Sequence, residues 1–188
     1  MITDTKEIIY ASNINKNSIC IEIGVHRGIN AEKIIKYEPK LLHLVDCWDC
    51  QKDYFITNDI PKHSHGFACT EKQLTWYNEV KDKFDKLQNV RIIKEYSNNV
   101  LTQFEDGYFD FIYIDGLHDY DSVLNDIQKW SAKLKDTGII VCDDYVRNDK
   151  RGYGVIPAVA DFLKSNNQYI SHVLRERLCI IKRMESVI

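Results

Sequence analysis

The 188-residue sequence has no long uninterrupted run of apolar residues, and its first residues contain no apolar signal core. A membrane-spanning helix needs about 20 consecutive apolar residues, and a secretory signal needs an apolar stretch after a basic one. The chain offers neither, so we expect a soluble, cytoplasmic protein without a membrane partner. Its length suits a single domain spanning residues 1–188, large enough to bury its own core.

Basic residues are not in excess either. Lys and Arg number 25 against 28 Asp and Glu, which gives a formal net charge of −3. Binding to a nucleic-acid backbone depends on clustered positive charge, and here the basic residues are scattered. We therefore expect no nucleic-acid partner. A small neutral or anionic substrate fits this charge balance better.

The six cysteines lack the paired spacing of a complete zinc site. Cys47 and Cys50 form one CxxC, but a structural zinc site needs two further ligands at suitable spacing. Cys69, His63 and His65 are candidates, and the alternative is a pair of reduced thiols in a loop. The remaining cysteines lie in apolar, strand-like runs and are expected to be buried core thiols: Cys20, Cys142 and Cys179.

The turn after the first predicted strand lacks one glycine of a dinucleotide fingerprint. The segment IEIGVHRGINAEKI places Gly24 and Gly28 four residues apart, whereas that fingerprint reads GxGxxG. Glu22 lies in the strand ahead of this turn, and Asp46 ends the next strand, about twenty residues after the turn, where a carboxylate can bind both ribose hydroxyls of a nucleoside. An acid there is compatible with NAD as well, and the glycines could be purely structural.

Short apolar runs alternate with amphipathic helical patterns, which is typical of a doubly wound parallel sheet. The predicted strands are residues 18–24, 41–46, 90–94, 109–115, 138–143, 169–174 and 178–182. Only a short polar turn separates the last two strands, so they must be antiparallel, because a parallel pair needs a crossover. We therefore expect an α/β fold with a seven-stranded, mostly parallel sheet and a terminal antiparallel hairpin.

Helical patterns fill most connections between these strands. We predict helices over residues 30–37 and 98–104, and a helix whose first turn holds Pro157. A further helix places apolar residues on one face: Leu74, Tyr77, Val80 or Lys81, Phe84 and Leu87. The crossover helix carries a stripe that packs on the sheet: Tyr120, Val123, Leu124, Ile127, Trp130 and Leu134.

The segment 47–69 is too long for an ordinary connection and is predicted to be a lid or substrate loop. Its candidate contacts for a substrate are Trp48, Tyr54, Phe55, His63, His65 and Phe67. The loop after residue 144 adds Arg147, Arg151 and Tyr153. Aromatic side chains can stack on a sugar or on an aromatic ring, so they do not identify the acceptor.

Acidic residues end two neighbouring predicted strands. The stretch DFIYIDGLHDYDSVLNDIQKWSAKLKDTGIIVCDDY delivers Asp115 after one strand and Asp143 and Asp144 after the other. In an open α/β sheet, ligands bind beyond the carboxyl ends of the strands, so these acids are candidates for chemistry. The alternative is that Asp143 and Asp144 cap a loop while Asp115 is an acid at a helix N-terminus.

These segments resemble known methyltransferases. An acid ahead of a GxxxG turn resembles motif I of the class I S-adenosylmethionine-dependent methyltransferases. The stretch with the three acids resembles the methyltransferase domain 24 family of small-molecule O-methyltransferases, related to the macrolide-sugar enzymes and distantly to catechol O-methyltransferase. The resemblance implies a Rossmann-like sheet in the order 3-2-1-4-5-7-6 with S-adenosylmethionine as cofactor. It implies these cofactor-binding residues: Glu22, Gly24, Gly28, Asn30, Asp46, Ser97 and Asp115.

The resemblance also implies a metal site and a general base. In metal-dependent relatives three acidic or amide ligands follow the fourth and fifth strands, which here are Asp115, Asp143 and Asp144. Three hard oxygen ligands suit Mg²⁺ better than zinc. His118 is the candidate base, at the offset that carries a catalytic lysine in the catechol enzymes, although a His there can also be a capping residue. Several sugar-modifying relatives have an Asp base where this chain has Leu117.

We therefore expect a Mg²⁺-dependent O-methyltransferase, with Asp115 and His118 as catalytic residues. Its acceptor would be a small-molecule hydroxyl, on a sugar or sugar-derived natural product by resemblance, and a homodimer is the candidate assembly. The alternatives are an NAD-binding oxidoreductase and a catalytically silent nucleoside-binding protein.

Overall fold

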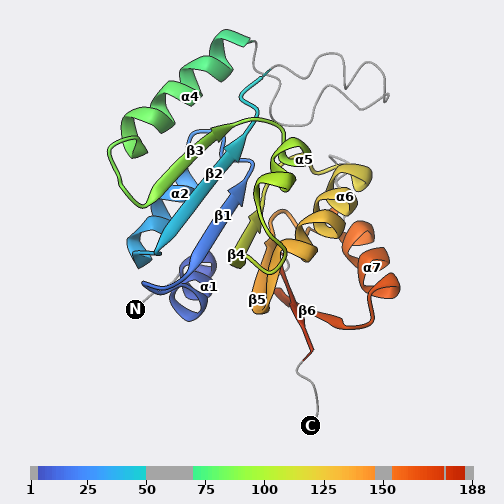
Figure 1. The fold of residues 1–188 in the computed structure, drawn as a ribbon. Coiled ribbons are helices and arrows are strands. Elements are labelled where there is room, and N and C mark those ends of the chain that lie inside the picture. The colour runs from blue at the N-terminus through green and yellow to red at the C-terminus, as the bar shows by residue number, and fades with distance from the viewer. Residues whose placement is uncertain (1–3, 50–69, 147–153, 176, 185–188) are drawn as a thin grey trace.

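The computed structural model describes residues 4–49, 70–146, 154–175 and 177–184. These residues build a seven-stranded sheet in the order β3-β2-β1-β4-β5-β7-β6 (Figure 1). The strands are β1 (Ile19–Ile23), β2 (Leu41–Asp46), β3 (Val90–Lys94), β4 (Phe109–Ile114), β5 (Leu134–Cys142), β6 (Tyr169–Leu174) and β7 (Leu178–Arg183). Strands β1 to β5 are parallel, and β7 lies antiparallel between β5 and β6. The predicted fold class, strand order and terminal hairpin are confirmed.

Helices cover both faces of the sheet. On one face lie α1 (Thr5–Asn13), α2 (Ile29–Ile34) and α4 (Thr70–Phe84), and on the other lie α5 (Ser97–Val100), α6 (Tyr120–Trp130) and α7 (Val155–Ser165). Single 3-10 turns follow three of these helices, at Ile35–Tyr37, Leu101–Gln103 and Ser131–Lys133. Figure 1 shows α5 and α6 next to each other beyond the end of β4.

Successive strand residues feed two separate cores, because side chains alternate between the faces of a sheet. In β4, Phe111 and Tyr113 pack with Tyr10 of α1, whereas Ile112 and Ile114 pack with α6 and α7. All four strand residues are buried. A central strand buried on both faces explains the continuous apolar runs in the sequence.

Three local predictions were wrong. Leu134 starts β5 and does not belong to the crossover helix, which ends at Trp130. The fifth strand therefore begins earlier than residue 138, with an irregular register between Phe109 and Phe111 of β4. Leu74 and Leu87 are exposed, so the buried stripe of α4 is carried by its last turns, and Leu87 lies beyond the end of the helix.

Helix α1 was not anticipated. Asp4 caps it by accepting a hydrogen bond from the backbone N–H of Lys6 at 2.9 Å, and Ile9 and Tyr10 are buried beneath it. The predicted lid lies outside the described residues except at its start, where Trp48 is buried and contacts Tyr77. Trp48 is therefore a core residue in this structure and not an exposed substrate contact.

The three cysteines predicted to be core thiols are free and buried, as expected. Cys47 is partly buried, whereas Cys50, Cys69, His63 and His65 lie outside the described residues, as do Arg147, Arg151 and Tyr153. Among the described residues, no helix combines the length and the apolar character that a membrane crossing requires.

Candidate functional site

The glycine turn after β1 brings two strand ends into direct contact. Gly24 has φ +86°, and a Cβ atom there would lie 2.2 Å from the backbone oxygen of Asp115. Only glycine combines that dihedral with so close an approach. Gly28 has φ +74° and begins α2, and a Cβ there would meet the Phe84 ring at 2.8 Å. Gly24 thus packs the turn against β4, and Gly28 packs α2 against α4.

A pocket of about 1180 Å³ lies at the carboxyl ends of β1, β2 and β4. This is the crevice where open α/β sheets bind ligands. It is lined by most of the predicted cofactor and catalytic residues: Glu22, Gly24, Asn30, Asp46, Ser97, Asp115 and His118. Gly28, Asp143 and Asp144 do not line it.

Asp46 holds the two loops that form one wall of the pocket. Its Oδ2 accepts from the backbone N–H of His26 at 2.8 Å, and its Oδ1 accepts from the backbone N–H of Trp48 at 2.9 Å. Each carboxylate oxygen can accept more than one hydrogen bond. Asp46 is therefore fixed in orientation and retains acceptor capacity toward the pocket.

Glu22 and Asn30 place buried polar atoms at the floor of the pocket. Glu22 is 1% exposed, and its Oε2 has no hydrogen-bond partner. The Nδ2 of Asn30 is buried as well, and its Oδ1 accepts from the Tyr10 hydroxyl. Burial raises the pKa of Glu22 to about 8, although Asn30 and Lys6 act in the opposite direction. Asn30 acts on the Glu22 carboxylate through a side-chain hydrogen bond, so the floor of the pocket holds a buried acid next to a buried amide.

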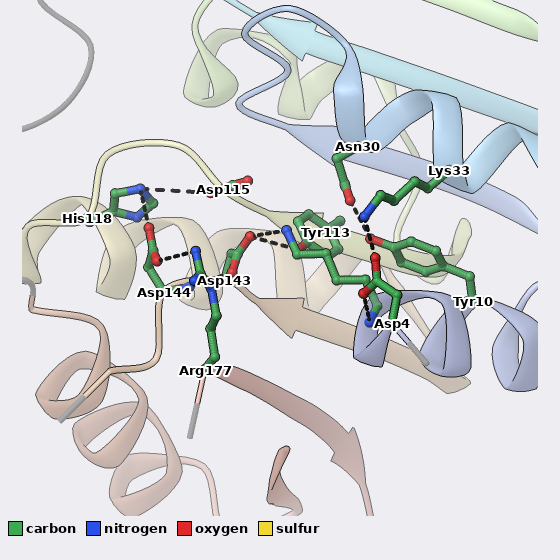
Figure 2. A network of polar contacts seen from close by, with 11 residues as sticks. Asp4, Tyr10, Asn30, Lys33, Tyr113, Asp115, His118, Asp143, Asp144 and Arg177 are labelled. Carbon is green, nitrogen blue, oxygen red and sulfur yellow. Dashed lines mark hydrogen bonds and ion pairs between the residues drawn. The ribbon is translucent and has the colours of Figure 1, made fainter. Parts of the chain in front are cut away.

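Asp115, His118 and Asp144 form one cluster beside this floor. His118 Nε2 lies 3.8 Å from Asp115 Oδ1 and 3.4 Å from Asp144 Oδ2, and Figure 2 shows the imidazole between the two acids. Burial, and then repulsion by the Asp143 carboxylate, raise the pKa of Asp115 well above its usual value. One ligand atom from each of the three residues lies within 4.8 Å of the others, so the cluster can hold a cation.

Asp143 points away from this cluster. Its Oδ2 pairs with the Lys6 ammonium of α1 and accepts from the Tyr113 hydroxyl at 2.9 Å. Burial acts to raise the pKa of Asp143, but the Lys6 charge and the hydrogen bonds from Lys6, Asp144 and Tyr113 together outweigh it, so the pKa is lowered. Asp144 has φ +51°. This left-handed backbone sends successive carboxylates in different directions, so Asp144, not Asp143, meets His118 (Figure 2).

Sequence reasoning missed Lys6, which lines the pocket from α1. The available signal was an N-terminal capping pattern, with Asp4 followed three residues later by Glu7. A second pair also fixes α1, because Asp4 accepts from the Lys33 ammonium of α2 (Figure 2). Asp126 of α6 was missed as well, although it is buried and lines the same pocket.

The sheet order and the pocket beside the glycine turn define the class. They are those of the class I S-adenosylmethionine-dependent methyltransferases. A family model described as a methyltransferase domain, methyltransferase domain 24, matches residues 21–145. The chain belongs to this family and is a methyltransferase.

Solved structures share the fold at low sequence identity. The methyltransferase PaMTH1 of Podospora anserina, with S-adenosylhomocysteine bound, is 16% identical with a TM-score of 0.64, over 96% of this chain and 76% of that chain. SMU.1697c of Streptococcus mutans is provisionally assigned as a methyltransferase and was solved with S-adenosylhomocysteine. It is 15% identical with a TM-score of 0.63, over 98% and 100% of the two chains. A provisionally assigned caffeoyl-CoA O-methyltransferase of Staphylococcus aureus is 14% identical with a TM-score of 0.61, over 95% and 80%.

Proposed function

We propose that this methyltransferase uses S-adenosylmethionine to methylate a hydroxyl group of a small molecule. The observation that carries the proposal is the pocket at the carboxyl ends of β1, β2 and β4, which brings the buried carboxylate of Glu22 together with Asp46. An amino-acid group and a ribose are the parts of this cofactor that such residues suit. The bound S-adenosylhomocysteine of two structural neighbours supports the same cofactor.

The residues divide into two halves by their chemistry. Asp46 accepts hydrogen bonds from the ribose hydroxyls, and Glu22 accepts from the ammonium of the methionine end. Because an ammonium favours the ionised carboxylate, cofactor binding would lower the raised pKa of Glu22. Asp115, His118 and Asp144 form the other half and face the acceptor.

His118 is the proposed general base. Its Nε2 takes the proton of the acceptor hydroxyl, and the carboxylate of Asp144, at 3.4 Å, stabilises the resulting imidazolium. This arrangement requires an acidic group beside His118 Nε2. The alternative reading of His118 as a helix cap has no such requirement.

A divalent cation fits the same cluster, and we propose Mg²⁺ there. The carboxylates of Asp115 and Asp144 are hard oxygen donors, which this cation prefers. It would lower the pKa of the acceptor hydroxyl. The third ligand inferred from the family, Asp143, is already neutralised by Lys6. We therefore assign Asp143 a supporting role: its Oδ1 accepts from the backbone N–H of Asp144 at 2.8 Å.

The proposed acceptor class is a sugar or a sugar-derived natural product, and its basis is the family resemblance. The assignment of the Staphylococcus aureus neighbour as an O-methyltransferase supports an oxygen acceptor. The NAD-dependent alternative has no support from the family.

Calorimetry with S-adenosylmethionine, S-adenosylhomocysteine and NAD tests the cofactor. We expect binding of the two sulfur compounds and none of NAD; the reverse result would contradict the proposal.

Transfer of a radiolabelled methyl group to a panel of sugars, catechols and amines tests the acceptor. The sugars should be labelled, and a chelator should abolish this labelling. Labelling of amines alone would refute O-methylation, and activity that survives the chelator would refute the metal.

A further inference from the structure

Lys6 is a positive charge that helix α1 brings to the lining of the pocket. Its ammonium pairs with Asp143 Oδ2, and the side chain of Lys6 is 21% exposed whereas that of Asp143 is 5% exposed. The Tyr113 hydroxyl donates to the same carboxylate oxygen at 2.9 Å, and the Lys6 ammonium lies 5.2 Å from the centroid of the Tyr113 ring. The charge of Lys6 is therefore held against one buried carboxylate.

Contacts with α2 hold α1 in place, so Lys6 extends from a fixed base. Asp4, which caps α1, accepts from the Lys33 ammonium of α2. The Tyr10 hydroxyl of α1 donates to Asn30 Oδ1 of α2 at 2.5 Å. A buried carboxylate that loses its partner is costly, so the pair that Lys6 makes is a lasting part of the site, unlike an ion that can dissociate.

The paired carboxylate lies next to the cluster that can hold a cation. Asp143 Oδ1 accepts from the backbone N–H of Asp144 at 2.8 Å. After burial, the charge of Asp143 is the next cause of the raised pKa of Asp115, and the charge of Lys6 opposes it. Both charges therefore act on the cluster. For a cation bound there they largely cancel, which leaves the carboxylates of Asp115 and Asp144 to attract it.

We propose that Lys6 is a built-in counter-ion that prevents Asp143 from attracting a divalent cation and so keeps the affinity of the neighbouring cluster low. Lys6 acts through Asp143 and is a positioning residue. The cation then exchanges with the solvent, and its occupancy follows the Mg²⁺ concentration. The inference rests on the metal of the proposed function, and it adds the residue that sets the affinity for this metal.

Titration with Mn²⁺, followed by electron paramagnetic resonance at pH 7.5, tests the inference. Lys6→Met removes the ammonium and keeps an unbranched side chain. The unpaired charge of Asp143 then acts on the cluster, so Mn²⁺ should bind at least about tenfold more tightly than to the wild-type protein. Lys6→Arg keeps the positive charge and should keep the wild-type affinity. Lys36→Met removes an exposed ion pair between α1 and the turn after α2 and should also leave the affinity unchanged.

Asp143→Asn provides a second variant with the opposite sign. It leaves the charge of Lys6 unpaired, so Mn²⁺ should bind more weakly than to the wild-type protein, and this holds even if Lys6→Met does not fold. The double variant of Lys6→Met and Asp143→Asn lacks both charges. Its affinity should return to within about threefold of the wild-type value, because the effect of Lys6 passes through Asp143.

Unchanged or weaker Mn²⁺ binding by Lys6→Met, with cooperative urea unfolding as the check that it is folded, would overturn the inference and leave the proposed function intact. So would tighter binding that persists in the double variant, because the effect would then not pass through Asp143. Binding of Mn²⁺ by none of these proteins would overturn the proposed metal, and the inference with it. Calorimetry with S-adenosylhomocysteine tests the proposed cofactor separately, and its failure would not alter the Mn²⁺ result.

Discussion

Two adjacent carboxylates, Asp143 and Asp144, have different surroundings because the backbone turns between them. Asp143 pairs with Lys6, and Asp144 contacts His118 and, at 3.5 Å, Arg177. The neutralised Asp143 contributes little attraction to a cation in the neighbouring cluster. Asp144 is 13% exposed and remains accessible to one.

We predict that Asp144→Asn weakens divalent-cation binding more than Asp143→Asn does. The difference should be at least about tenfold in dissociation constant, or about 1.4 kcal/mol, because only Asp144 offers its carboxylate to the cluster. Titration of the protein with Mn²⁺, followed by electron paramagnetic resonance, measures this directly. Asp136→Asn, an exposed surface change, is the control. A larger loss in Asp143→Asn would place the cation on the Lys6 side.

We predict that His118→Gln lowers turnover about 100-fold or more, the usual contribution of a general base. The affinity for S-adenosylhomocysteine should change little, because His118 faces the two acids of the acceptor half. Steady-state kinetics and calorimetry separate the two effects. His172→Gln on β6, an exposed position, is the matched control. Unchanged turnover in His118→Gln would leave His118 with a structural role.

At the scale of elements, two glycines of one turn serve different contacts. The turn after β1 meets the backbone of β4 at Gly24, where there is no room for any side chain. The start of α2 meets a side chain of α4 at Gly28, and a side chain can move. Gly24 therefore makes a backbone contact at the pocket that tolerates no side chain, whereas Gly28 contacts a side chain in the core that can move.

We predict that Gly28→Ala destabilises the protein by about 1–2 kcal/mol, since alanine at φ +74° is strained. The Phe84 ring adds a clash to this strain. Phe84→Leu in the same chain should relieve the clash. The double variant should therefore lose less stability than the sum of the losses in the two single variants. Urea unfolding of the four proteins gives this coupling. The affinity for S-adenosylhomocysteine should stay unchanged, because Gly28 does not line the pocket. A lower affinity in Gly28→Ala would show that α2 also positions the cofactor.

At the scale of the whole molecule, the strands and the terminal hairpin follow from local patterns, whereas the strand order was implied by the family resemblance. Residues 111–114 are all apolar because β4 is buried on both faces there, and a short turn forces the last two strands to be antiparallel. The end of the crossover helix was misjudged because Leu134 continues its apolar spacing. That residue is buried as the first residue of β5.

The sequence predicted the site residues that lie at or near the ends of strands, but not the directions of all their side chains. The positions of Glu22, Asp46 and Asp115 follow from their places at the ends of β1, β2 and β4. The directions of Asp143 and Asp144 depend on one positive φ angle, which no spacing in the sequence reveals. Asp126 comes from a helix whose apolar pattern indicates only the side that packs on the sheet, so its contact with Ser97 required the fold.

His43, a buried residue of β2, makes the stability of the protein depend on pH. His43 of β2 is 7% exposed, and neither ring nitrogen has a hydrogen-bond partner. The centroid of its ring lies 5.0 Å from that of Phe104 and 5.7 Å from that of Phe109. Burial, and then the Arg91 charge, lower its pKa to about 4. The folded protein therefore holds the imidazole neutral at pH values where an unfolded chain would protonate it.

We predict that His43 makes the protein less stable as the pH falls from about 6.5 to about 4. In this window the unfolded chain binds a proton that the folded chain does not, so the free energy of unfolding drops by about 2 kcal/mol after allowance for solvent screening. Above pH 6.5 the residue is neutral in both states and has no such effect. Buried acids such as Asp126, with a pKa of about 6, titrate in the same range with the opposite sign, so the comparison must be with a variant. Urea unfolding of His43→Leu across this range should lack the His43 contribution, whereas His172→Gln should follow the wild-type curve. Parallel pH curves for His43→Leu and the wild-type protein would mean that His43 protonates within the folded core.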